Sequence, residues 1–365
     1  MIAFLAIVLP FAGRSAARSG ALLTRHRYGF GVWNDPGSAL QRFTLHRVRE
    51  MLFVLFVIGT GASALAQDYP TRPIRALTAT SAGGTSDVFM RVLGEEVRKR
   101  WGQPIVVENR PGGAMNVGGR ACADAANDGY TICILPPETL AYNQFLFKQI
   151  PFDPDKDFTP ITNPFFATQV MVVNSSLNVH SLAELAALSK AKPGTLSYTA
   201  ASIPLIAFMD KWAKATGADI VKVPFRGGAE AVNNVLGGST PVAFFGIANW
   251  MSLIRNGTVN ALAVDSKTRS PLLPDAPTLT ELGYGDNLTR LYFGIVAPAG
   301  TPSPIVHKLR DEFAAIGGDP EFRQKRLIDV GLEPVFDTPE EFATFLKADR
   351  VLSARLVHDA GMEPQ

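Results

Sequence analysis

The chain has 365 residues, of which 47% are hydrophobic and 19% charged, so it can form folded cores and is long enough for two domains. The net charge of +2 excludes a strongly basic nucleic-acid binder. Two cysteines exclude a disulfide-rich scaffold and a cysteine-based zinc cluster.

The N-terminal region carries the features of an exported protein. The apolar, uncharged run Met51–Ile58 follows three arginines and ends in small residues at Ala64–Ala66. A basic stretch, a short apolar core and an A-x-A site are typical of a secretory signal peptide. The run is shorter than the roughly 20 apolar residues of a membrane-spanning helix. We therefore expect cleavage after Ala66 and a location outside the cytoplasm, the alternatives being a retained anchor or a buried helix.

Residues 1–50 fit this pattern poorly. A signal peptide that starts near Val48 or Met51 would have an ordinary length. Our hypothesis is that 1–47 or 1–50 comes from an upstream start codon and forms no domain. Residues 1–66 would then be an upstream extension plus the signal peptide. They hold seven arginines against two acids, so the remaining chain has a net charge near −3.

From Tyr69 onward, short apolar runs alternate with segments of helical periodicity. The expected strands are Ile74–Ala79, Ile105–Glu108, Tyr130–Leu135, Gln169–Val173, Leu196–Thr199, Ile220–Val223, Val242–Phe245, Ala261–Val264 and Leu291–Val296. The expected helices are 86–101, 117–126, 181–190, 206–216, 230–236, 304–316, 320–329 and one that opens at Thr338. Short strands separated by helices imply βαβ units, so we predict an α/β fold with mostly parallel sheets. Two domains without a linker suggest crossings near 163–169 and 285–291.

Catalytic signatures are missing from the sequence. It contains no G-x-S-x-G elbow, no phosphate-binding P-loop, no H-E-x-x-H and no G-x-G-x-x-G after the first strand. No second histidine lies three or four residues from His180, His307 or His358, so we expect no metal, no cofactor and no enzyme activity. Cys122 and Cys133 fit buried free thiols best, with a disulfide as the alternative in an oxidising compartment.

Three turns that follow strands are rich in small residues: 80–87, 109–116 and 224–228. Glycines let the backbone approach a ligand, and the helix that follows presents free N–H groups to an anion. Turns at the carboxyl ends of strands converge on one crevice in open α/β sheets. The alternative for each turn is a packing role. Together they favour a cleft that binds anions.

These segments carry a family resemblance. The sequence resembles the Bug family, the extracytoplasmic solute receptors of tripartite tricarboxylate transporters, from about Tyr69 to Arg350. The matching segments are Ser81–Asp87, Val107–Gly113, Asp128–Thr131, Pro151–Asp153 with Asp157-Phe158, Val223–Gly227, Ala261–Val264 with Arg269-Ser270, Leu273–Thr278 and Ala297–Pro302.

The resemblance implies a two-domain periplasmic binding protein of type 2, with the ligand held in a cleft between the domains. One domain would comprise 68–168 and 290–365, and the other 169–289. Relatives hold small carboxylates largely through backbone N–H groups. The implied ligand-binding residues are Ala82, Gly83, Gly84, Thr85, Asp87, Thr139, Ala201, Ser202, Gly227 and Gly228. Asp87 would orient its turn, meet a ligand donor or cap the helix.

Two departures from the family pattern affect the second domain. The stretch Ala200–Ile206 is more apolar than the Gly- and Ser-rich loop of relatives and about two residues shorter by our count, and Gly246 stands where relatives often have Asp. The ligand is therefore expected to be less polar at its far end, for example a monocarboxylate with an apolar or aromatic body. A receptor that has lost binding is the alternative.

The function implied is a receptor that closes on a small carboxylate and delivers it to membrane permease subunits. Such a receptor is expected to be a monomer with no affinity for nucleic acid. A second hypothesis is a periplasmic sensor that signals to a membrane histidine kinase. A hydrolase on the same scaffold would need a nucleophile with a base in reach, and the sequence offers no such set.

Overall fold

The computed structural model describes residues 69–200, 202–224, 228–285 and 290–365, and the structural statements below concern these residues. The predicted signal peptide and its cleavage site lie outside them, as do Ala201, Gly227 and part of the second predicted crossing. Within the described ranges, no helix combines the length and the apolar character needed to span a membrane.

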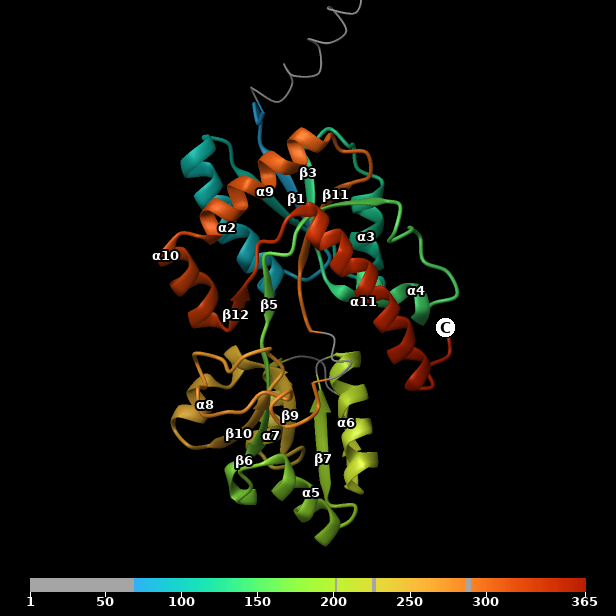
Figure 1. Cartoon of the computed structure of the whole chain (residues 1–365), viewed down its shortest axis with the longest axis vertical. Helices are drawn as coiled ribbons and strands as arrows, with labels where there is room; N and C mark the ends of the chain where they lie inside the picture. The colour runs from blue at the N-terminus through green and yellow to red at the C-terminus, as the bar shows by residue number, and fades with distance from the viewer. Residues whose placement is uncertain (1–68, 201, 225–227, 286–289) are drawn as a thin grey trace, which may run out of the picture. The chain divides into compact units, whose positions relative to one another are not determined.

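The first sheet has five strands in the order β2–β1–β3–β11–β4. Figure 1 labels β1, β3 and β11 of this sheet. β1 pairs in parallel with β2 and β3, whereas β11 pairs antiparallel to β3 and β4. The strands, in the same order, are Ile105–Asn109, Ile74–Thr78, Thr131–Leu135, Gly294–Pro298 and Phe158–Thr162.

Alternate residues of this sheet face two separate cores. Ile132 and Ile134 of β3 pack with α2 (Thr85–Trp101) and α9 (Ser303–Gly317). Cys133 and Leu135 face the other way, toward α3 (Asn116–Ala123) and α11 (Pro339–Asp359). We call this sheet and its helices the first lobe.

The second sheet has the order β10–β6–β9–β7–β8. β7 pairs in parallel with β8 and β9, and β6 pairs antiparallel to β9 and β10. α5 (Leu182–Ala191) and α6 (Ile203–Thr216) cover one face, and α7 (Gly228–Leu236) and α8 (Met251–Arg255) the other. We call this the second lobe. Its strands, in the same order, are Val259–Val264, Gln169–Asn174, Val242–Gly246, Leu196–Ala200 and Ile220–Lys222.

Shorter elements complete the fold. β5 (Phe165–Ala167) and β12 (Leu332–Pro334) form a two-stranded antiparallel sheet. A π turn, η2 (Glu138–Tyr142), leads from β3 into α4 (Asn143–Leu146). The remaining short helical elements are η1 (Gly113–Met115), η3 (Ser175–Leu177), η4 (Ile247–Asn249), α10 (Pro320–Phe322), η5 (Arg323–Leu327) and η6 (Ile328–Val330).

The predicted α/β class is confirmed, but the expectation of mostly parallel sheets is wrong. Each large sheet has two parallel and two antiparallel pairings. A helical crossover produces parallel neighbours. No helix lies between β5 and β6 or, among the described residues, between β10 and β11. β6 and β11 make all four antiparallel pairings of the large sheets. The strands of the first sheet come from 74–162 and 294–298, and those of the second from 169–264. The domain boundaries at 168/169 and 289/290 stay a prediction.

Helix ends follow the sequence signals closely. Gly102 ends α2 in the left-handed conformation. Thr338 and Glu341 form the predicted capping box of α11. Ser181 caps α5 as predicted, but the Glu184 carboxylate accepts from the N–H of His180, so the reciprocal half of the box is displaced by one residue. The predicted helix 320–329 is interrupted by a π turn and a 3₁₀ turn.

Candidate functional site

The first small-residue turn, between β1 and α2, is shaped by a carboxylate. Gly83 has a φ of +81°, in the left-handed region that glycine adopts at no steric cost. Its N–H donates to Asp87 Oδ2 at 2.9 Å, and the N–H of Gly84 donates to the carbonyl of Ser81 at 3.2 Å. In this conformation both N–H groups close the turn, and the role of Gly83 and Gly84 as backbone donors to a ligand stays a prediction.

Asp87 orients this turn, which was one of the three roles considered for it. Its side chain is buried, and Arg91 donates to Oδ1 from Nη2 at 2.8 Å and from Nε at 3.1 Å. These hydrogen bonds hold the pKa of the Asp87 carboxyl below its usual value. Arg91 follows Asp87 by four residues on α2, the spacing of an intrahelical ion pair. Our sequence analysis missed the role of Arg91, although this spacing from Asp87 could have indicated it.

Other N–H groups of the turn remain open. Among the described residues, no acceptor is found for the N–H groups of Ala82, Thr85 and Ser86. Ala82 and Thr85 are exposed. The Ser86 hydroxyl is buried and contacts the hydroxyls of Thr78 at 2.8 Å and Thr80 at 2.6 Å. The start of the 17-residue α2 thus presents unpaired donors at its positive end.

The second turn, between β2 and α3, lies against the first. Asn109 Nδ2 donates to the Thr80 carbonyl at 3.1 Å, and the N–H of Arg110 donates to the Thr78 carbonyl at 2.8 Å. A Cβ on Gly118 would lie 2.6 Å from Cα of Ala79, so glycine lets α3 pack directly on the chain that leaves β1. The two turns are therefore adjacent, as the shared ends of parallel strands require.

The segment after β3 supports the second turn. Thr139 is fully buried and donates from Oγ1 to the Met115 carbonyl at 3.4 Å. Asn143 Nδ2 donates to the Ala114 carbonyl and to Asn116 Oδ1, each at 2.8 Å. Thr139 was predicted as a pocket residue, but it contacts the turn rather than solvent. Asn143 was missed, although it is a polar residue within the apolar run 140–146.

The residues predicted on the second lobe are only partly described. Ala201 and Gly227 lie outside the described residues, and Gly228 begins α7. Ser202 is the N-cap residue of α6, yet its side chain makes no capping hydrogen bond. It is followed by Ile203, Pro204 and Leu205, so the start of α6 is apolar apart from the serine hydroxyl.

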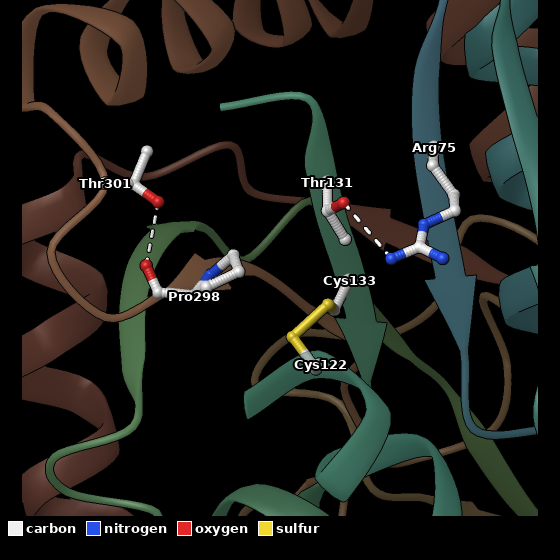
Figure 2. The surroundings of a disulfide bond; sticks show 6 residues. All are labelled: Arg75, Cys122, Thr131, Cys133, Pro298 and Thr301. Carbon is white, nitrogen blue, oxygen red and sulfur yellow. Dashed lines mark hydrogen bonds between the residues drawn. A yellow bond between two sulfur atoms is a disulfide. The ribbon is translucent and has the colours of Figure 1, made fainter. Parts of the chain in front are cut away.

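A disulfide joins Cys122 of α3 to Cys133 of β3, and both residues are fully buried (Figure 2). The expectation of free thiols is wrong, and the alternative that we had kept for an oxidising compartment is correct. Close packing of α3 on the sheet brings the two Cα atoms to 6.1 Å, a distance that a disulfide spans. The bond fixes the C-terminal half of α3, whose other end carries the second turn.

A cavity of about 610 Å³ lies elsewhere, between α6 and α11. None of the predicted site residues lines it, and the charged side chains at its edge, such as Lys211, Lys214 and Arg355, are exposed. Within the described part of the chain, no group of three or more His, Cys, Asp or Glu could hold a metal ion. We therefore place the candidate site at the strand-end turns, where buried polar contacts fix the geometry.

The fold and these turns define a solute-binding protein with two α/β lobes. The family model described as the tripartite tricarboxylate transporter family receptor matches residues 89–362, so the chain belongs to that family. BugT of Bordetella pertussis is 31% identical over 310 residues, which are 83% of this chain and 94% of BugT.

Solved structures agree with this assignment. Rhodopseudomonas palustris Rpa4515 with adipate has a TM-score of 0.72 at 27% identity, covering 81% of this chain and 100% of that one. The periplasmic binding protein BugD has a TM-score of 0.68 at 30% identity, with the same two coverages. The family, the predicted fold class and the prediction that this is no enzyme are confirmed, since the matching family is one of receptors and BugD is a periplasmic binding protein.

Proposed function

We propose that this chain is a periplasmic receptor that captures a small carboxylate by closing its two lobes and delivers it to the membrane permease of a tripartite transporter. Family membership supports the transport role, and the adipate in Rpa4515 supports the ligand class. The observation that carries the proposal is the set of unpaired N–H groups at the start of α2.

The donors on the first lobe belong to the backbone. Ala82 and Thr85 offer exposed N–H groups, whereas the guanidinium of Arg91 on the same helix is paired with Asp87. Backbone donors at a helix start stabilise a carboxylate without a mobile cationic side chain. We assign Ala82 and Thr85 as carboxylate donors and give Gly83, Gly84, Ser86, Asp87 and Thr139 the role of shaping the turns.

The second lobe would supply the other wall. The Ser202 hydroxyl is not used for capping and is free to meet the ligand, together with the backbone at Gly228. Ala201 and Gly227 keep their predicted role as contacts outside the described residues. The apolar start of α6 supports a ligand with an apolar body, such as a monocarboxylate, or a dicarboxylate with a methylene chain.

Closure requires a hinge at the strands that connect the sheets. There the N–H of Gln169 donates to Asp265 Oδ1 at 2.7 Å. Burial raises the pKa of Asp265 to about 6, despite the opposing influence of Arg290. We propose that lobes comprising 68–168 with 290–365 and 169–289 move about this connection. Cleavage after Ala66 and a monomeric state complete the proposal.

Thr85 provides a test of the backbone donors. Replacing it with proline deletes one N–H at the first position of α2, where proline is well tolerated. Gly84 precedes it with extended backbone (φ −71°, ψ 165°), which a following proline accepts. One lost hydrogen bond to a charged group should cost about 1.5–3 kcal/mol, or roughly 10- to 150-fold in Kd.

The control is Thr85→Ala, which keeps the N–H and removes only the side chain. Calorimetric titration with adipate and a panel of mono- and dicarboxylates should show weaker binding for Thr85→Pro alone, with both variants melting near the wild-type temperature. Equal affinities of the two variants would remove Thr85 from the site. A wild-type protein that binds no member of the panel would overturn the proposed function.

A further inference from the structure

The second turn contains a run of unfavourable backbone conformations. Gly112, Gly113, Ala114 and Met115 have φ values of +118°, +55°, +51° and +72°. Glycine accepts positive φ freely, but other L-residues lose roughly 1–2 kcal/mol each in the left-handed region. Among the described residues, two other non-glycine positions, Asn178 and Phe336, have positive φ, and they are isolated. Strain in two adjacent residues persists only where the surroundings impose it.

Asn143 contacts this strained turn directly. Its side chain is 1% exposed, and its amide nitrogen donates to the Ala114 carbonyl and to Asn116 Oδ1, both at 2.8 Å. An amide nitrogen has two hydrogens, so both donors are used on this one turn. Thr139 adds a weaker contact to the Met115 carbonyl at 3.4 Å. The carbonyls of both strained residues are thus held from the segment that follows β3.

This support reaches the candidate site through α3. The strained turn leads directly into α3, whose Gly118 touches Ala79 just before the first turn. The other end of α3 is fixed to β3 by the disulfide. The start of α3 is therefore the part of this helix whose placement depends on the strained turn. Gly113 and Ala114 are exposed, and their N–H groups have no acceptor among the described residues.

We propose that Asn143 is a positioning residue for ligand binding. It holds Ala114 and Met115 in the left-handed conformation and thereby presets the second turn beside the donors of α2. Without Asn143 the two residues relax toward negative φ and the turn leaves its place against the first turn. Binding of a carboxylate must then restore the turn, which lowers the affinity. This inference rests on the proposed function, since it assigns a role within the same site.

The test is a cycle of variants titrated with adipate, or with the strongest ligand of the carboxylate panel. Asn143→Ala is expected to raise Kd at least tenfold. The paired change Ala114→Gly with Met115→Gly removes the strain, because glycine adopts positive φ readily. In this glycine background, Asn143→Ala should change Kd by less than about threefold. A residue that only packs would have the same effect in both backgrounds.

Asn178→Gly is the matched control. It removes the same kind of strain at φ +51°, but at the end of η3 in the second lobe. It should leave the effect of Asn143→Ala unchanged. If Asn143→Ala does not fold, Asn143→Ser takes its place, because serine retains one of the two donors and should give a smaller loss with the same dependence on background.

Hydrogen exchange measured without ligand distinguishes a failure of the positioning role from a failure of the proposed function. Peptides covering 110–118 should exchange at least tenfold faster in Asn143→Ala than in the wild type. Unchanged exchange, or a loss of affinity that is equal in both backgrounds, would overturn the positioning role. A wild-type protein that binds no carboxylate while its variant exchanges faster would instead refute the proposed function and leave Asn143 with a structural role only.

Discussion

The two lobes have the same arrangement of sheet and helices, but they differ in the residues at the ends of their strands. Each has a five-stranded sheet with two parallel and two antiparallel pairings and helices on both faces. In the first lobe, side chains such as Asp87, Asn109 and Asn143 form hydrogen bonds to the backbone of the strand-end turns. In the second lobe, α6 opens with a serine whose side chain makes no capping hydrogen bond, followed by three apolar residues. The same scaffold thus supports a fixed polar anchor on one side and an apolar wall on the other.

This difference suggests a division of labour. Under the proposed function, the turns of the first lobe would recognise what all ligands of this class share, namely a carboxylate, with backbone donors already in place. The second lobe would then select the body of the ligand by its shape. A sharper selection for a new ligand should therefore come from changes near the start of α6, while changes in the first lobe should weaken all ligands alike.

The largest expected effect comes from breaking the covalent support of the first lobe. The double change Cys122→Ser with Cys133→Ser opens a loop with a sequence separation of 11 and places hydroxyls in a buried site. Losing a disulfide of this span should cost about 3 kcal/mol in the free energy of unfolding. Urea titration measures this loss, and the same loss should appear in the wild type with a reductant present. A wild-type protein insensitive to the reductant would contradict this expectation.

A smaller loss is expected for Asp87→Asn, which removes the charge that Arg91 pairs with and weakens the acceptor of the Gly83 N–H. We expect a loss of about 2 kcal/mol at pH 7, since hydrogen bonds to charged groups contribute about 1.5–3 kcal/mol. The pKa of Asp87 is lowered in the folded state, chiefly by Arg91, so its contribution is present above the unfolded pKa.

That contribution should disappear as the pH falls through the lowered pKa of the folded state. Unfolding of wild type and Asp87→Asn should therefore be compared at several pH values from neutral to strongly acidic, and the two curves should converge at the acidic end. A difference that stays constant with pH would show that Asp87 acts through packing rather than through its charge.

The smallest effects on stability are expected from replacing two serines at helix starts within the second lobe. Ser181 accepts from the N–H of Glu184 at 3.1 Å, so Ser181→Ala should cost about 1 kcal/mol. Ser202 makes no capping hydrogen bond, so Ser202→Ala should change stability by less than about 0.5 kcal/mol. Thermal unfolding distinguishes the two. Ligand affinity should fall only for Ser202→Ala, and a reversed order would exclude Ser202 as a free polar group of the site.

The sequence predicted those features that depend on local chemistry. The helix start at Thr338, the end of α2 at Gly102 and the position of both glycine-rich turns in the first lobe follow from residues within a few positions of each other. Strand direction does not, because it depends on distant partners. The short β4, which contains Pro160, and β5 and β12 were missed for the same reason: each is defined by a strand far away in the chain.

Within the candidate site, the sequence located the turns but not the use of each atom. The N–H of Gly83 faces Asp87 only because Gly83 adopts a positive φ. The support from Asn143 requires that the segment after β3 lie beside the turn after β2, a tertiary fact. The disulfide depended on the distance between α3 and β3, which sequence spacing alone left open.

The position of β11 between β3 and β4 bears on the order in which the polypeptide can fold as it is synthesised. β4 pairs only with β11 within the described sheet, and β11 follows every strand of the second sheet in the chain. The second lobe can therefore assemble from one continuous stretch of chain before β11, the partner of β4, has been synthesised. Completion of the first lobe is a late event, and a chain truncated before Gly294 should retain an exposed strand edge that invites aggregation.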